Sequence, residues 1–313
     1  YKLVPNFHDT YRNPATPSRY GLLETIDPRS AQIVALFNSI QTNIEAAGFA
    51  DAIEKLNYSY MIAPYMVSIG GNARFVAGRD LGYSDVRMPI WEISHDIRTT
   101  EELIRNAEPR VGRYDSYVRD MKDYFDRIAK LPFILDSEKD AFSIGIGLFW
   151  KDVRIKFIGN SCVVETRPFS TQPTVVEDIA MHAFYLGRLL YSQSTREPLL
   201  DIGFVNINRQ NAMNYGLNAQ LVYRDENNAI KISDAKTVLA LEIKKAEEGL
   251  QKFGFHSEKY LNILKERLRT GDTPSQIFAR EFAKERAEDV DVTNSLLASL
   301  RTSGDIYGKN NRN

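Results

Sequence analysis

The amino-acid sequence predicts an α+β fold in which a curved antiparallel sheet lines an active site and helices pack on its outer face. Two observations indicate this class. Short alternating or apolar segments, typical of strands, lie at residues 36–46 and between residues 141 and 167, where a Gly-Asn pair predicts a tight hairpin. Longer amphipathic patterns, typical of helices, follow from residue 174 to about residue 300.

Composition limits the class of protein. The 313 residues are 43% hydrophobic and 26% charged, which suits a substantial core and excludes a mostly disordered chain. The 40 basic and 41 acidic residues nearly cancel, so we expect no nucleic-acid partner and expect a local cluster to bind any charged ligand. No apolar run of about 18 residues occurs, and we expect no membrane partner. Cys162 is the single cysteine, which excludes an intrachain disulfide and favours a reducing cytoplasm.

We expect one catalytic-type domain over residues 1–302 and a frayed tail at residues 303–313. Residues 1–30 contain four prolines and little periodicity, which indicates a loop or a connector. The chain begins without an initiator Met or a signal-peptide pattern. We therefore expect an N-terminal part of the domain to be missing.

The first half of the chain predicts a strand, a helix and a polar loop. In the strand, Leu36–Ala46, the polar side chains of Gln41, Asn43 and Glu45 alternate with apolar ones. A helix follows from about Asp51, which Pro64 is expected to kink or break and which should end at Gly70 and Gly71. Residues 72–87 are too polar for a core element and rich in glycine and arginine, so we interpret them as a functional loop.

The second half predicts three strands and then helices. An apolar helical stripe at residues 118–128 precedes strands at residues 141–150, 153–158 and 162–167. Thr174 and Glu177 form a capping-box pattern before an apolar helix over residues 179–190. The remaining elements are expected to be a helix at 198–215, a hairpin at 219–223 and 230–232, and three or four amphipathic helices to about residue 300.

Glu165 and Arg167 are the charged pair that best suits chemistry. They lie two residues apart on a predicted strand, so both side chains leave one face about 6.5 to 7 Å apart, with Arg154 on the preceding hairpin strand. A carboxylate there suits a divalent cation, and a guanidinium suits a carboxylate or a phosphate. A solvated surface ion pair is the alternative, and spacing alone favours it.

Other candidate groups give weaker signals. Arg74, Arg79 and Arg87 are in one glycine-containing loop that suits either a polyphosphate clamp or a solvated surface. The four histidines show no metal-binding spacing, and Cys162 is expected to be a buried, inert thiol. No P-loop, dinucleotide-binding or nucleophile-elbow motif occurs.

Four segments in the same order resemble the glutamate-cysteine ligase family of the glutamine-synthetase-like superfamily. They are Ser39–Glu45, similar to the plant-type Q-x-N strand; Asn72–Phe75 with Gly78, Gly82, Arg87, Ile90 and Trp91; Lys151–Arg154 with Val164–Arg167 and Gln172–Thr174; and Asn208–Leu217. Together they cover roughly residues 20 to 285.

The resemblance implies a glutamine-synthetase-like catalytic fold and ATP-dependent ligation. In such a reaction the γ-carboxylate of glutamate is phosphorylated, and an amine, most often that of cysteine, captures the acyl phosphate. The expected cofactors are ATP and Mg²⁺ or Mn²⁺. The residues carried over are catalytic Arg167 and Arg87; substrate- or ATP-binding Arg154, Asn72, Arg74, Asn43 and Arg209; and the metal ligands Glu165 and Gln41.

The sequence also departs from the family pattern. The family's first, acidic strand has no counterpart here, Ala73 and Arg74 replace a Ser-Pro pair, and Asn214 replaces an arginine. We expect the missing strand on a further N-terminal segment; a homo-oligomer or a partner chain that supplies it, and loss of catalysis with the fold kept, are the alternatives. The alternatives are a non-catalytic binding or regulatory subunit with the same fold and a guanidino kinase of the same superfamily.

Overall fold

A computed structural model describes residues 38–76, 79–96, 98–105, 107–131, 145–256 and 258–288. These residues form a mixture of helices and small, open sheets, which confirms the α+β class. The chain divides into two compact units. Among the described residues, the sheet unit comprises those within 38–60 and 87–167, and the helical unit comprises those within 61–86 and 168–288.

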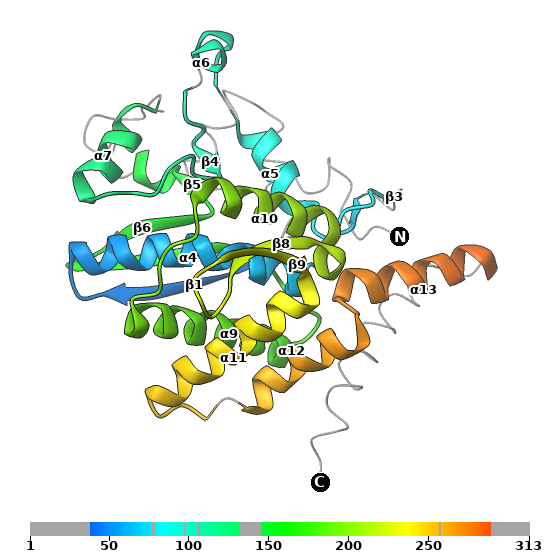
Figure 1. Ribbon diagram of the computed structural model, residues 1–313. Helices are drawn as coiled ribbons and strands as arrows, with labels where there is room; N and C mark the ends of the chain where they lie inside the picture. Colours follow the sequence, from blue (N-terminus) through cyan, green and yellow to red (C-terminus); the bar gives the residue numbers. More distant parts are fainter. Residues whose placement is uncertain are drawn as a thin grey trace. The chain divides into compact units, whose positions relative to one another are not determined.

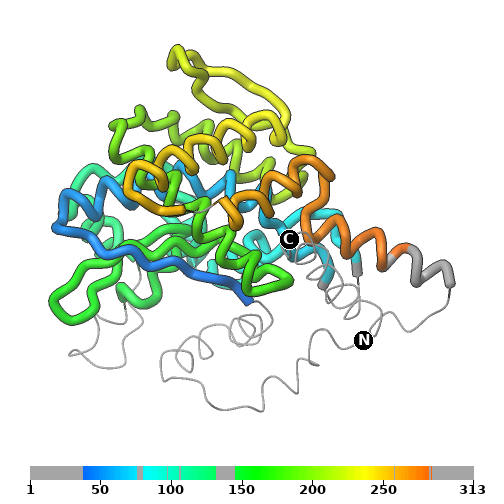
Figure 2. The backbone as a smooth tube through the Cα atoms, turned by 90° about the horizontal axis from the view of Figure 1, so that it is seen from below, coloured from blue at the N-terminus to red at the C-terminus, as the bar shows by residue number. Residues whose placement is uncertain are grey.

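The sheet unit is built on three strands in the order β1-β7-β6, with β1 at Ser39–Ala46, β6 at Val153–Ile158 and β7 at Ser161–Ser170. Figure 2 shows β1, in blue, beside the green strands. The pairing of β6 with β7 is antiparallel and runs from Val153 opposite Thr166 to Ile158 opposite Ser161. Gly159, with φ of 59°, makes the tight turn that the Gly-Asn pair predicts.

One face of the β6–β7 hairpin is apolar and buried. Val153, Ile155 and Val164 are fully buried there. The hydroxyl of Tyr124 donates to the carbonyl of Ile155 at 3.0 Å and accepts from its amide at 2.8 Å, which anchors a helix to the edge of the sheet. That helix is α7, Met121–Ala129, and Asp120 caps its first turn.

The other elements of the sheet unit are short. They are α5 at Arg87–His95, α6 at Thr100–Ile104, and the parallel pair of β4 at Val111–Gly112 with β5 at Trp150–Lys151.

In the helical unit, α9 at Val175–Thr195 packs against α11 at Ala235–Lys252 and α12 at Glu258–Thr270 (Figure 1). Two glycines allow the closest contact. A Cβ added at Gly249 would lie 2.0 Å from the carbonyl oxygen of Gly187, so only hydrogen fits there. The remaining elements are β2 at Phe75–Val76, β3 at Arg79–Asp80, α10 at Ile202–Tyr215, η1 at Gly216–Asn218, β8 at Gln220–Arg224, β9 at Ile230–Asp234 and α13 at Pro274–Glu288.

Most predicted elements are confirmed, and three predictions are wrong. Pro64 does not break the predicted helix, because α4 runs without interruption from Phe49 to Gly70 and is buried on most sides around it. Residues 145–147 are helical, so the described residues 145–149 do not form the predicted strand, and pairing begins only at Trp150 and Lys151. The helix predicted from residue 198 begins at Ile202, because the Asp201 side chain caps it.

Several predictions fall outside the described residues. They concern the connector at residues 1–30, the start of the first strand, residues 141–144, the end of the last helix and the tail at 303–313. The single-domain prediction stays a prediction. Within the described ranges, no helix is long and apolar enough to cross a membrane.

Candidate active site

The site is built on the polar face of the β6–β7 hairpin. Arg154 lies directly opposite Glu165 in the register, and Arg167 follows two residues later on β7. Because side chains alternate along a strand, all three leave the same face of the sheet. Lys156, two residues after Arg154 on β6, shares this face.

Glu165 gathers three cations, which we call the cation cluster: Arg154, Lys156 and Arg167. Its Oε2 accepts from Arg154 Nε at 2.5 Å and from Arg167 Nη1 at 2.9 Å, and its Oε1 accepts from Lys156 Nζ at 3.0 Å. The Glu165 side chain is 1% exposed, and that of Arg167 is 12% exposed. The surface ion pair that spacing alone favoured is therefore wrong for Glu165.

Charge, more than burial, sets the protonation of this carboxylate. Burial alone would raise the pKa of Glu165, but Arg154 and Arg167 outweigh it and lower the pKa to about 2. Burial lowers the pKa of Arg167 to about 10, with Arg154 acting in the same direction and Glu165 opposing both. The cluster thus holds a net charge of about two positive units, which favours an anion at this face.

The first strand adds polar groups to the same face. Ser161 Oγ donates to Glu45 Oε1 at 2.8 Å, so Glu45 and Ser161 lie on one side of the β1–β7 pair. By alternation, Gln41 and Asn43 leave this side of β1, and Glu165 leaves it on β7. Gln41 and Asn43 are exposed. The predicted strand with one polar face is confirmed.

Arg87 begins α5 in the sheet unit and is 8% exposed. It is near enough to Arg167 to contribute to the lowered pKa of that guanidinium. The catalytic role that the resemblance implies for Arg87 stays a prediction.

Asn72, Arg74 and Arg209 belong to the helical unit. Asn72 Nδ2 donates to the carbonyl of Thr171 at 2.8 Å, and Arg74 Nε pairs with Asp80 at 2.8 Å. Arg209 is buried on α10 with 4% exposure. Their predicted roles in binding substrate or ATP also stay predictions.

A metal ion would compete with the cation cluster. Both oxygens of Glu165 already accept from cations, and the described residues contain no group of three or more His, Cys, Asp or Glu side chains that could hold a metal ion. The metal-ligand roles of Glu165 and Gln41 stay predictions, and they require further oxygen ligands.

Sequence reasoning missed Lys156. The signal was available, because Lys156 follows Arg154 at the two-residue spacing that placed Glu165 and Arg167 together. The family-like segment Gln172–Thr174, by contrast, serves the fold. Thr174 caps α9, while Gln172 and Glu177 accept from the buried Arg267 at 2.7 Å and 2.8 Å.

The fold and the site define a class: an α+β protein with a buried carboxylate that fixes three cations on one face of an antiparallel sheet. The family model for glutamate-cysteine ligase family 2 (GCS2) matches residues 5–294. The chain belongs to this family. It is also 22% identical over 274 residues to the chloroplastic glutamate–cysteine ligase of Arabidopsis thaliana. That alignment covers 81% of this chain and 50% of the relative, so the chain spans about half the relative's length.

Proposed function

We propose that the protein is an ATP-dependent carboxylate-amine ligase that joins the γ-carboxylate of glutamate to an amine, most often that of cysteine. The observation that carries this proposal is the cation cluster, which lies on the segment that resembles the family's V-E-x-R motif. Membership of the family supports the reaction type.

The reaction has two steps. A carboxylate oxygen attacks the γ-phosphorus of ATP, the bond to ADP breaks, and an acyl phosphate forms. The amine nitrogen then attacks the acyl carbon, phosphate leaves with the carbon–oxygen bond pair, and the amine proton passes to solvent. Both steps concentrate negative charge on oxygen, which fixed cations stabilise.

Each residue of the cluster has a proposed task. Arg167 binds the substrate carboxylate or the acyl phosphate, because its guanidinium is buried and already oriented by Glu165. Arg154 and Lys156 supply further positive charge, and Glu165 holds the three cations in place. Here Glu165 is a positioning residue.

The remaining assignments rest on the family resemblance. Arg87 is proposed to be catalytic, and Asn72, Arg74, Asn43 and Arg209 are proposed to bind substrate or ATP. Mg²⁺ or Mn²⁺ is proposed to accompany ATP, with ligands in addition to Glu165 and Gln41. A cytoplasmic location and a homo-oligomer or partner chain that completes the sheet also belong to the proposal.

The test is ADP release from ATP with glutamate and a panel of amines that includes cysteine. We expect release that requires both glutamate and an amine, and we expect Arg167→Lys to lower kcat/KM at least about tenfold because lysine lacks the bidentate fork. Arg119→Lys, at a guanidinium 79% exposed in the same unit, is the matched control and should change little.

Three outcomes would contradict the proposal. Equal kcat/KM for Arg167→Lys and the wild type would remove Arg167 from the site. ATP binding without ADP release for any amine would favour the non-catalytic subunit. Phosphate transferred to a guanidine would favour the guanidino kinase.

A further inference from the structure

A cavity lies in the helical unit, on residues that the proposed reaction does not use. Its volume is about 490 Å³, which suits a ligand of the size of an amino acid or a dipeptide. The walls come from the C-terminal end of α9 with the loop after it, from the tip of the β8–β9 hairpin, and from one face of α11. The hairpin is the yellow-green loop at the top of Figure 2.

Two of the lining residues, Glu197 and Lys245, belong to a buried ion network. Arg188 is fully buried and donates to Glu242 at 2.6 Å and to Glu197 at 2.9 Å. Lys245 donates to the same two carboxylates at 2.9 Å each. Two cations and two anions balance each other there, so the network ties α9, the following loop and α11 together without needing a ligand.

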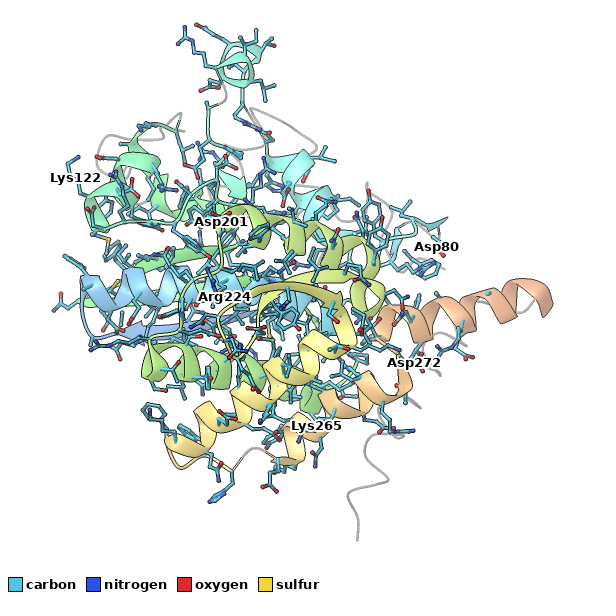
Figure 3. All side chains as sticks on the ribbon, viewed as in Figure 1. Asp80, Lys122, Asp201, Arg224, Lys265 and Asp272 are labelled. Carbon is cyan, nitrogen blue, oxygen red and sulfur yellow. The ribbon has the colours of Figure 1, made fainter. Side chains whose placement is uncertain are left out.

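Arg224 on β8, labelled in Figure 3, is not neutralised by a carboxylate within the described residues. Its Nη1 donates to the carbonyl of Asn228 at 3.0 Å and its Nη2 to that of Leu199 at 3.3 Å. These bonds hold the half-buried guanidinium still and use two of its five donors. Its Nε is buried without a hydrogen-bond partner, and no carboxylate pairs with Arg224 among the residues described.

Acidic side chains stand at the rim of the same cavity. Glu226, on the hairpin tip, and Glu248, on α11, are exposed, and neither forms an ion pair within the described ranges. The rings of Tyr191 and Tyr223 also line the cavity and offer apolar contact. The lining also includes Lys244, exposed on α11, and Asp225, whose carboxylate accepts from the backbone amides of Asn227 and Ala229. The cavity thus presents cationic groups, carboxylates and an apolar surface.

We propose that this cavity binds a small zwitterion, an amino acid or a dipeptide, whose carboxylate pairs with Arg224 and whose ammonium group faces Glu226 and Glu248. A polyanion such as a nucleotide would meet the two free carboxylates, and a simple cation would meet Arg224. Only a ligand that carries both a positive and a negative charge can pair with Arg224 and with the two carboxylates at once. The proposal does not rest on the ligase reaction, because it uses none of the residues assigned there.

The test is a ligand-observed NMR titration of the full chain with L-alanyl-L-alanine. Its N-acetyl derivative and its C-terminal amide each lack one charge. We expect saturable binding of the dipeptide and at least about tenfold weaker binding of both derivatives. Glu226 lies on an exposed loop, so the Glu226→Gln variant should fold normally. It should weaken binding of the dipeptide more than binding of the N-acetyl derivative. The Arg224→Gln variant should weaken binding of the dipeptide more than binding of the C-terminal amide.

Two matched variants separate this site from the proposed active site. Arg269→Gln replaces a guanidinium that is 73% exposed and outside the cavity, and it should leave dipeptide binding unchanged. Arg167→Lys should also leave it unchanged. The proposal is overturned if the dipeptide does not bind, if the N-acetyl derivative binds as tightly as the dipeptide, or if Arg167→Lys weakens binding while Arg224→Gln and Glu226→Gln do not.

Discussion

Glu165 has both a structural and a chemical effect. It is buried, and it is the only carboxylate that hydrogen-bonds to Arg154, Lys156 and Arg167 within the described residues. Removing its charge leaves three cations facing one another on one sheet face. Glu165, which the family resemblance predicts to bind a metal, is therefore also the group that permits this density of positive charge.

We expect Glu165→Gln to lower the free energy of unfolding by about 3 kcal/mol or more, because breaking a buried ion pair leaves uncompensated charge. Urea denaturation at neutral pH measures this effect. Glu101→Gln is the matched control, since the Glu101 side chain is 70% exposed in its pair with Arg105, and the change there should stay below about 1 kcal/mol. Equal stability of Glu165→Gln and the wild type would show that the cations relax into solvent.

The same residue predicts a pH dependence. The pKa of Glu165 is about 2 in the folded protein and 4.5 in its ordinary state, so its stabilisation is complete above about pH 4.5 and is lost as the pH falls toward about 2. The loss is on the order of 3 kcal/mol. The difference in unfolding free energy between the wild type and Glu165→Gln should shrink across this window. A difference that is independent of pH would contradict the lowered pKa.

At the scale of elements, the contact between α9 and α11 sets the geometry of the helical unit. Gly187 and Gly249 let the two helices approach until the backbone of one contacts the other. Arg188 and Glu242 then pair close to this contact. Small residues and a buried ion pair therefore fix the same interface.

Gly249→Ala should destabilise the helical unit by about 1–3 kcal/mol, although alanine favours a helix, because its Cβ would lie 2.0 Å from the carbonyl oxygen of Gly187. Gly48→Ala is the control, since nothing lies within 4 Å of its added Cβ. Chemical denaturation measures both variants. An increase in stability for Gly249→Ala would show that the helices separate without cost.

The first strand carries a prediction about the site. Gln41 is exposed on β1 and shares a face with Glu165, so Gln41→Ala should lower turnover and raise the metal requirement without unfolding the protein. The measurements are ADP release against Mg²⁺ concentration and thermal unfolding. Lys122→Ala, at a lysine 82% exposed on α7, should change neither. Unchanged turnover in Gln41→Ala would exclude Gln41 from the site.

Local chemistry explains which elements the sequence predicts. The Gly159–Asn160 turn and the Thr174 cap depend on one or two residues each, and both are confirmed. Pro64 and residues 145–147 depend on tertiary context, because burial lets α4 continue through a proline and an apolar run forms a short helical segment where a strand was expected. The strand period also brings Arg154, Glu165 and Arg167 together, and the same period applied to β6 would have predicted Lys156.

At the scale of the whole molecule, the sequence alone does not predict which charged side chains are buried. Charged pairs two residues apart on a strand are usually solvated, so Glu165 looked like a surface residue until its 1% exposure was known. The pairing of Arg74 with Asp80 and the bond of Asn72 to Thr171 also require the folded chain. Family membership links these separate observations to one reaction type.

The central claim is that the cation cluster serves the transfer of a phosphoryl group to a carboxylate. The most direct test follows a heavy-oxygen label from the γ-carboxylate of glutamate during turnover with ATP and an amine. The attacking oxygen leaves with the phosphorus, so we predict that the label appears in inorganic phosphate and that Arg167→Lys slows its appearance. Phosphate that carries no label while ADP and amide accumulate would contradict the claim.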